Sequence, residues 1–436
     1  MRDLFSDHTR IQRMLDFEAA LAHAQARLGV IPAAAANAIE KNCVASQIDF
    51  IALAHDAERA GNLAIPMVQQ LTAFVAKDHA EAAKFVHWGA TSQDAIDTGL
   101  VLQLRDALDL IDRGLAELAR ALIAQIKQHR DTLMVGRTLL QHALPITFGL
   151  KVAGWLDAVT RHRERLKELR PRILVLQFGG AAGTLAALGS QGSAIAAALA
   201  QELNLALPEM PWHGQRDRVA EVATVFGLLA GTLGKIARDV SLCMQTEVGE
   251  LAEPTAPGRG GSSTMPHKHN PIGCALVMSA AIRVPGLVST MLAAMPQEHE
   301  RGLGGWHAEW ETLPEIFKLA AGALHQMTVV IVGLEVNTTR MRANIDQTNG
   351  LIMAEAVAMT LAAHLGKIEA HRIVEHACNK AMQESRHLRE VLADEPLIQT
   401  RISAPELKKL MNPANYLGET QSFIDGVLAA ADKNEK

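Results

Sequence analysis

Two long apolar stripes constrain the fold of this chain more than any other feature of its sequence. Apolar residues recur at three- and four-residue steps at positions 222, 225, 226, 229, 233, 236, 237 and 240, and again at positions 313, 316, 317, 320, 324, 327, 331 and 334. This spacing places the members of each stripe on one face of an α-helix of about five turns. Helices of that length must bury such faces against one another, so the sequence predicts a bundle of long helices with coiled-coil-like crossing.

The amino-acid composition extends this prediction to the whole chain. Of its 436 residues, 49% are hydrophobic but only 4% are aromatic, so the core must consist mostly of Ala, Leu, Val and Ile. Ala and Leu are among the best helix formers, and alternating, strand-like runs are scarce, which predicts an all-α protein. We expect an N-terminal helical domain over residues 1–95, a central long-helix bundle domain over 96–345 and a small helical domain over 346–436.

Charge, hydropathy and cysteine patterns exclude several classes of protein. The net charge of -5 is small and spread along the chain, which does not fit a nucleic-acid-binding surface. Residues 1–14 lack the apolar core of a signal peptide, and the most apolar later run, residues 327–334, is too short to span a bilayer. We therefore expect a cytoplasmic protein without membrane segments. The four cysteines are widely separated in the sequence, which disfavours a zinc site or a disulfide framework. They are Cys43, Cys243, Cys274 and Cys378.

A glycine-rich stretch carries the residues best suited to catalysis. Residues 258–271 read Gly-Arg-Gly-Gly-Ser-Ser-Thr-Met-Pro-His-Lys-His-Asn-Pro, and their glycines predict a mobile loop that ends where the helical pattern resumes after Pro271. An ammonium group and backbone N–H groups near a serine hydroxyl would stabilise its alkoxide and lower its pKa, so Ser262 and Lys268 are candidates for proton transfer. On the residues alone, a glycine-rich linker with incidental serine and lysine is the alternative.

The same stretch closely resembles the signature sequence of a known enzyme family. Residues 261–271 are similar to the signature of the fumarase/aspartase superfamily, which includes argininosuccinate and adenylosuccinate lyases. Residues 86–98 and 136–149 resemble two further conserved blocks of this superfamily. His269 departs from the pattern because relatives more often carry Arg there, which makes the charge at this position pH-dependent. The resemblance implies a homotetramer with a central core of long helices, in which each active site is built from three subunits.

The resemblance also implies roles for individual residues. Ser262 would exchange the proton on the carbon α to a carboxylate, and Lys268 would stabilise the doubly charged aci-carboxylate that forms. A small-molecule tricarboxylate substrate also requires cations, and the sequence does not choose among the available arginines. These are Arg137, Arg216, Arg218, Arg259, Arg283 and Arg301.

Other polar residues of the conserved blocks are expected to bind the substrate. Those that would hydrogen-bond its carboxylates are Thr91, Ser92, Thr138, Gln141 and Asn270. From the residues alone, Thr91 and Ser92 are equally suited to capping the helix that follows them. His142 has three possible roles: it orients a carboxylate, acts as a second acid or base, or packs beside Pro145 as a structural residue.

Two departures from the superfamily pattern bear on the reaction. Leu139 stands where relatives have a histidine, and Ala275 stands where the glutamate that supports this histidine would be. Hydratases and amine lyases of the superfamily use this histidine to protonate the departing hydroxide or amine. A carboxylate leaving group has a pKa of about 4 and departs as the anion, so it needs no such acid. The pattern therefore favours lactone opening or, in reverse, addition of a substrate carboxylate across a carbon–carbon double bond.

Together with these departures, the resemblance implies an intramolecular lyase, a cycloisomerase acting on a tricarboxylate in the breakdown of aromatic compounds. The chain shows no G-x-G-x-x-G, P-loop or histidine-rich ligand spacing, so we expect no cofactor and no metal. Two alternatives are an adenylosuccinate-lyase-type amine lyase of the same fold and a non-catalytic structural homologue. The missing acid at Leu139 argues against the first, and the presence of Ser262, Lys268 and Asn270 argues against the second.

Overall fold

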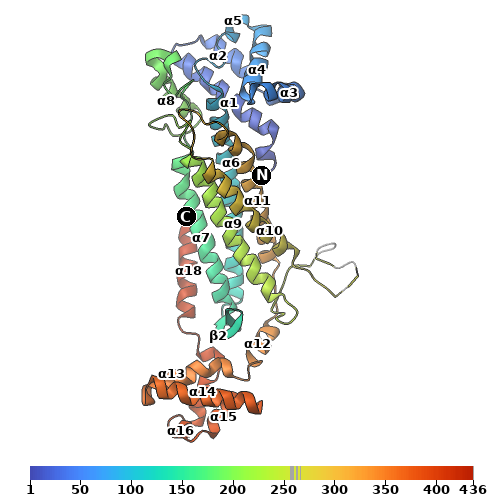
Figure 1. Cartoon of the computed structure of the whole chain (residues 1–436), viewed down its shortest axis with the longest axis vertical. Helices are drawn as coiled ribbons and strands as arrows, with labels where there is room; N and C mark the ends of the chain where they lie inside the picture. The colour runs from blue at the N-terminus through green and yellow to red at the C-terminus, as the bar shows by residue number, and fades with distance from the viewer. Residues whose placement is uncertain (256–259, 262–263, 266, 436) are drawn as a thin grey trace. The chain divides into compact units, whose positions relative to one another are not determined.

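Helices dominate the structure (Figure 1), a computed structural model that describes residues 1–255, 260–261, 264–265 and 267–435. The all-α prediction is confirmed. Within the described residues, the strands form two small antiparallel pairs: β1 (Leu133–Thr138) with β2 (Gln141–Thr147), and β3 (Leu251–Ala252) with β4 (Glu335–Val336). Short 3-10 helices occur at Asp3–Phe5, Ala45–Gln47, Ala186–Gln191, Leu351–Met353 and Pro413–Asn415.

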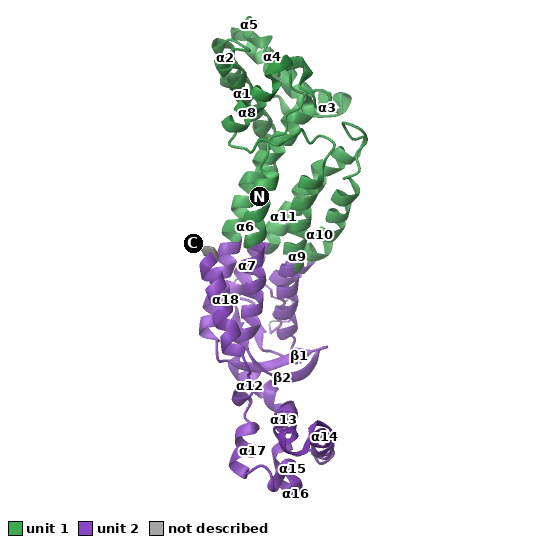
Figure 2. Ribbon diagram, turned by 90° about the vertical axis from the view of Figure 1, so that its left-hand side faces the viewer, with its two compact units in different colours: residues 1–114, 163–231, 279–323 green, residues 115–162, 232–278, 324–436 purple. Residues whose placement is uncertain are grey.

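The chain divides into two compact units (Figure 2). Unit 1 contains residues 1–114, 163–231 and 279–323, and unit 2 contains residues 115–162, 232–278 and 324–436. The longest helices have residues in both units, and they are α6 (Ser92–Gln128), α7 (Phe148–Ile173), α9 (Asp217–Cys243), α10 (Ile272–Ala293) and α11 (Gly305–Val332). The two apolar stripes lie in α9 and α11, except that Leu334 follows the end of α11, so both long-helix predictions are confirmed. In unit 1 the two stripes meet, because the rings of Phe226 and Phe317 are buried with centroids 4.1 Å apart.

Short helices pack around α1 in unit 1. They are α1 (Asp7–Arg27), α2 (Ala33–Asn42), α3 (Phe50–Ala60), α4 (Ala64–Asp78), α5 (Ala80–Ala83) and α8 (Gly192–Glu202). The Ser6 side chain accepts a hydrogen bond from the Thr9 N–H and so caps α1. Leu15 joins the core that contains α2, whereas Phe17 and Leu21 join the core that contains α8. Two sides of α1 are therefore buried.

The long helices carry more apolar surface than the chain itself covers. By length and composition alone, α9, α10 and α11 are each apolar enough to cross a membrane. The sequence-based hydropathy argument was wrong on this point, because it considered residues 327–334 and not the whole of α11. Only 28% of the most apolar window of α10 is buried, and Ile282 on this helix is 74% exposed. One face of α10 therefore lacks an apolar partner among the described residues.

Unit 2 combines a hairpin with a group of short helices. The hairpin β1–β2 was not predicted, because its turn residues Leu139 (φ 49°) and Leu140 (φ 65°) replace the Asn-Gly type of sequence that signals such a turn. A core of its own holds together most of the short helices, which are α12 (Thr338–Asp346), α13 (Ala354–Leu365), α14 (Lys367–Glu384), α15 (Leu388–Asp394), α16 (Pro396–Gln399) and α17 (Ala404–Leu410). The last helix, α18 (Thr420–Glu435), instead contacts the segment just after α6, where Asp425 accepts a 2.7 Å hydrogen bond from Arg130.

Candidate functional site

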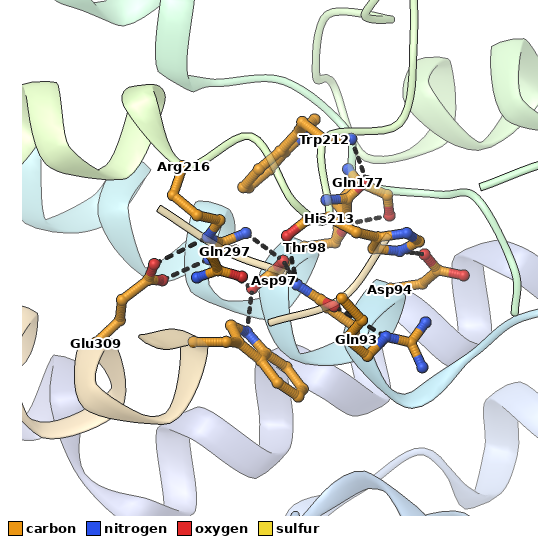
Figure 3. A network of polar contacts seen from close by, with 12 residues as sticks. Gln93, Asp94, Asp97, Thr98, Gln177, Trp212, His213, Arg216, Gln297 and Glu309 are labelled. Atoms are coloured by element: carbon orange, nitrogen blue, oxygen red, sulfur yellow. Dashed lines mark hydrogen bonds and ion pairs between the residues drawn. The ribbon is translucent and has the colours of Figure 1, made fainter. Parts of the chain in front are cut away.

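A buried carboxylate lies at the start of α6 in unit 1 (Figure 3). Oδ1 of Asp94 accepts hydrogen bonds from the Gly179 N–H at 3.0 Å and from Nε2 of His213 at 2.7 Å. Oδ2 of Asp94 accepts from the N–H groups of Gly180 and Thr91, both at 3.0 Å. Asp94 is 0% exposed and His213 is 3% exposed. This carboxylate therefore joins three segments that are far apart in the sequence.

The hydroxyls of Thr91 and Ser92 are not used to cap α6. The carboxylate of Asp94, three residues further on, accepts the Thr91 N–H, which is half of a capping box. Neither hydroxyl makes a hydrogen bond within the described part of the chain. Both side chains are half-buried. Asp94 therefore provides the capping interaction that was the alternative role of Thr91 and Ser92. Binding of a substrate carboxylate stays the prediction for their two hydroxyls.

A second buried network lies one turn further along α6 (Figure 3). The guanidinium of Arg216 donates to Asp97 at 2.7 Å through Nη1 and to Glu309 at 2.9 Å through Nε. Asp97 also accepts a 3.0 Å bond from the Trp306 indole. Burial alone would lower the pKa of Arg216, but the two carboxylates outweigh it and raise the pKa. Arg216 is therefore a structural cation, and it is not available to a substrate.

Gln93 connects this network to the surface at Arg301. Its Nε2 atom donates to Oδ2 of Asp97 at 3.0 Å and to the His213 carbonyl at 3.1 Å. Its Oε1 atom accepts a 3.1 Å bond from Nε of Arg301, whose Nη2 donates to the Ala181 carbonyl at 3.1 Å. Within the described residues, Arg301 has no carboxylate partner. It is an exposed guanidinium held by two neutral oxygens beside the start of α6.

The other arginines proposed from the sequence are placed differently. Arg137 is paired with Glu250 and Arg283 is paired with Glu315. Arg218 donates to a backbone carbonyl, that of Arg172. Arg259 lies outside the described residues. Of the described candidates, only Arg301 combines an exposed side chain with hydrogen bonds to residues around Thr91 and Ser92.

The hairpin in unit 2 brings three predicted residues together. Thr138 and Gln141 are paired directly across the turn, and His142 is opposite Arg137. The turn between them exposes Leu139 almost completely, at 97%. Partial burial and the positive charge of Arg137 lower the pKa of His142, although Glu250 opposes them. His142 is therefore a neutral hydrogen-bonding group near pH 7.

The signature loop in unit 2 is only partly described. Ser262, the proposed proton-transfer residue, lies outside the described residues. Lys268 is exposed, and the Asn270 N–H donates to the Gly260 carbonyl at 2.8 Å. Where the loop joins α10, the buried carboxylate of Glu253 accepts the N–H groups of Gly273 at 2.9 Å and of Cys274 at 2.7 Å. The carboxylate thus caps α10, which begins at Ile272 directly after Pro271 as predicted.

Sequence reasoning missed a histidine–glutamate pair in unit 1. Nδ1 of His87 lies 2.6 Å from Oε1 of Glu18, which is 1% exposed. Burial would lower the pKa of His87, but the charge of Glu18 and its hydrogen bond outweigh it and raise the pKa. His87 has a left-handed backbone, with φ 59°, which is uncommon for a residue with a side chain. Its place in the block 86–98 was the available signal, as it was for Gln93 and Asp94.

The described residues contain no group of three or more His, Cys, Asp or Glu side chains that would hold a metal ion. The polar side chains around the start of α6 in unit 1 that have no charged partner among the described residues instead include the hydroxyls of Thr91 and Ser92 and the guanidinium of Arg301. Such groups bind carboxylates. The chemistry that this arrangement supports is recognition of a small acid.

Comparison with known proteins identifies the class. A protein-family profile described as "Lyase" matches residues 1–286, and one described as "Adenylosuccinate lyase C-terminus" matches residues 350–427. The chain therefore belongs to this family of lyases, which confirms the resemblance to the fumarase/aspartase superfamily.

Individual members of the family are similar to this chain over nearly its whole length. The chain is 58% identical over 429 residues to the 3-carboxy-cis,cis-muconate cycloisomerase of Pseudomonas aeruginosa, covering 98% of this chain and 94% of the relative. It is 48% identical over 436 residues to the enzyme of the same name from Acinetobacter baylyi, covering 100% and 97%. A crystal structure of 3-carboxy-cis,cis-muconate lactonizing enzyme from Pseudomonas putida matches with a TM-score of 0.95 and 55% identity, over 100% of this chain and 97% of that one.

Proposed function

We propose that this chain interconverts 3-carboxy-cis,cis-muconate and 4-carboxymuconolactone, as an intramolecular lyase in the β-ketoadipate route of protocatechuate breakdown. The likeness to two cycloisomerases over nearly the full length of all three chains supports the substrate. The observation that carries the reaction is Leu139, which occupies the position of the superfamily's acid at the exposed tip of the hairpin. Ala275, in the first turn of α10, likewise offers no carboxylate.

The missing acid fits this reaction because of the group that leaves. In lactone opening, the bond from the β carbon to the ring oxygen breaks, and the electron pair stays on a carboxylate. With a pKa of about 4 for its conjugate acid, this group departs as a stable anion. In the reverse direction, the carboxylate adds to the double bond and the carbon α to another carboxylate takes up a proton. A proton is thus handled only at carbon.

Ser262 and Lys268 are the residues that we propose for this proton transfer. The serine hydroxyl protonates the α carbon during lactonisation and removes the same proton in reverse. The ammonium of Lys268 stabilises the serine alkoxide and the negative charge on the aci-carboxylate. In the described residues, the Lys268 side chain is exposed and makes no hydrogen bond, so it is available for this role.

Substrate binding is assigned to polar side chains that have no charged partner among the described residues. Thr91 and Ser92 at the start of α6 offer hydroxyls, and Arg301 supplies a cation beside them. The side chains of Thr138, Gln141 and Asn270 supply further hydrogen bonds, and none of these makes one within the described chain. Neutral His142 orients a carboxylate by a hydrogen bond, because its lowered pKa does not favour a permanent positive charge.

We further propose a cytoplasmic homotetramer whose active sites each combine residues of three subunits. The uncovered apolar face of α10 supports assembly, since Ile282 is 74% exposed and Leu276 is 53% exposed in the single chain. The exposed hairpin tip supports a role in a neighbouring subunit. Sedimentation of the purified protein tests the stoichiometry. Mixing an inactive Ser262→Ala subunit with an inactive Thr91→Ala subunit tests sharing, because only shared sites regain activity.

An ultraviolet assay tests the proposed reaction. A muconate diene loses its absorbance when it is cyclised, so purified protein is offered 3-carboxymuconate and adenylosuccinate in parallel. We expect only the first to be consumed. The match of residues 350–427 to the adenylosuccinate lyase C-terminus is the observation that favours the second substrate. Consumption of adenylosuccinate alone would establish that alternative, and consumption of neither would favour a non-catalytic protein.

A further inference from the structure

The carboxylate of Asp94 is saturated with hydrogen bonds from three separate segments. Its four donors are the N–H groups of Thr91, Gly179 and Gly180 and the ring of His213, at 2.7 to 3.0 Å. A buried carboxylate without such donors would be strongly unfavourable. Each of the segments is therefore held at a fixed place relative to this one side chain.

The approach of the second segment depends on its glycines. A Cβ atom on Gly179 would lie 2.7 Å from Cβ of Pro211 and 2.9 Å from the ring of His213. Gly180 has a φ of +66°, which a residue with a side chain rarely adopts. These glycines bring two adjacent N–H groups to one carboxylate. The next residue along, Ala181, holds Arg301 through its carbonyl oxygen.

We propose that Asp94 is a positioning residue for substrate binding. It fixes the Thr91 and Ser92 hydroxyls against the segment 179–181 that holds Arg301, so that hydroxyls and guanidinium meet one substrate carboxylate. Asp94 itself is fully buried and does not touch the substrate. This inference rests on the proposed function for the identity of the substrate, and it assigns Asp94 a role in affinity beyond its contribution to folding.

Asparagine cannot replace Asp94, although the two side chains have the same shape. At Oδ1 one donor is the Gly179 N–H, and at Oδ2 the donors are the N–H groups of Gly180 and Thr91. Whichever way an asparagine amide is turned, its NH2 group faces a backbone N–H. Both groups are hydrogen-bond donors, and neither can accept. At least one of the segments must then move. By contrast, His213→Gln alters a single donor and leaves the backbone amides in place.

Asp94→Asn is compared with Asp239→Asn in the full-length protein. Asp239, in unit 2, accepts a 2.9 Å bond from the Trp155 indole and has a side chain that is 17% exposed, so its variant also loses a hydrogen-bonded carboxylate. We expect Asp94→Asn to raise KM for 3-carboxymuconate by at least about tenfold with a much smaller change in kcat, because the carboxylate concerned is bound equally before and during the reaction. Asp239→Asn should lower the melting temperature and keep KM. His213→Gln should give an intermediate KM.

A binding measurement separates this inference from the proposed function. Propane-1,2,3-tricarboxylate, a non-reacting tricarboxylate, should raise the melting temperature of the wild type and of Asp239→Asn, but not that of Asp94→Asn. Should the wild type prove inactive on 3-carboxymuconate, the proposed function fails and this shift alone decides the role of Asp94. An Asp94→Asn variant that melts earlier yet keeps KM and the shift would overturn the inference. So would a wild type whose melting temperature the tricarboxylate does not change.

Discussion

The guanidinium of Arg137 binds both carboxylate oxygens of Glu250, with Nη2 at 2.7 Å from Oε1 and Nη1 at 2.8 Å from Oε2. Glu250 is completely buried, and Asn344 donates a further 2.8 Å bond to it. The pair lies next to the hairpin turn, because Arg137, in β1, precedes the turn residue Leu139 by two positions. The strand end next to the turn is thus anchored by an ion pair, while the turn residue Leu139 is exposed.

Removing one member of this pair should be far worse than removing both. We expect Arg137→Met to lower the free energy of unfolding by about 3–5 kcal/mol, because it leaves a buried carboxylate without its cation. The double variant Arg137→Met, Glu250→Met should recover much of this loss. Urea unfolding of the single and double variants measures it. Equal losses in the two would mean that the arginine acts by packing alone.

Ser262→Ala should abolish turnover without changing the assembly or its melting temperature. The reason is chemical, since alanine cannot deliver a proton to the α carbon or remove it. Absorbance of the diene measures turnover, and calorimetry measures the melting temperature. Ser263→Ala is the matched control and should keep most of the activity. A Ser262→Ala variant with a near-normal rate would exclude the serine from proton transfer.

Leu139→His restores the superfamily's acid at the hairpin tip and should not accelerate lactone opening. The departing carboxylate needs no proton, so the imidazole has nothing to contribute. Because Leu139 is 97% exposed, stability should change by no more than about 0.5 kcal/mol. Steady-state kcat in both directions is the measurement. A rise of about tenfold or more would show that proton donation limits the reaction, contrary to the proposed mechanism.

Arg301→Ala should weaken substrate binding. Loss of a charge-assisted hydrogen bond of about 1.5–3 kcal/mol corresponds to a KM that is higher by roughly 10- to 160-fold. Arg105→Ala is a matched control, because Arg105 also donates to a carbonyl in unit 1, that of Leu203 at 2.9 Å, and is no candidate for substrate binding. Its KM should match that of the wild type. Identical KM values for the two variants would remove Arg301 from the site.

The His87–Glu18 pair should make stability depend on pH. Because the folded pKa of His87 is raised above its unfolded value, the pair's contribution is fully present below the unfolded pKa of about 6.5 and is lost as the pH rises through the folded value. The stability difference between the wild type and His87→Gln should therefore be larger at pH 6 than at pH 9. Urea unfolding at both values measures it. A difference that grows with pH would contradict the charged pair.

Periodicity predicted the helices well and their connections poorly. The stripes in α9 and α11 are long, and each reports on the helix that contains it, so local pattern was sufficient. The hairpin was missed because Leu139 and Leu140 adopt left-handed conformations that sequence gives no reason to expect. Tertiary context overrides their local preference.

The site was only partly predictable for a related reason. Resemblance to the superfamily pointed to Thr91, Thr138 and Lys268, because these lie in contiguous motifs. Three of the four partners of Asp94 lie 85 to 119 residues away in the sequence, and no local pattern pairs an aspartate with Gly179 or His213. For the same reason, the sequence did not distinguish Arg216, which is buried and paired with two carboxylates, from Arg301, which is exposed.

The uncovered face of α10 has a consequence for how the protein is made. If the chain assembles as proposed above, a newly synthesised subunit that has folded but has not yet associated exposes Ile282 and its apolar neighbours to other chains. Correct association of subunits then competes with aggregation, and the yield of assembled protein depends on how quickly the subunits associate. After dilution from denaturant, activity should therefore return at a rate limited by association of the subunits. The recovered fraction should fall at high protein concentration, where aggregation competes with correct association.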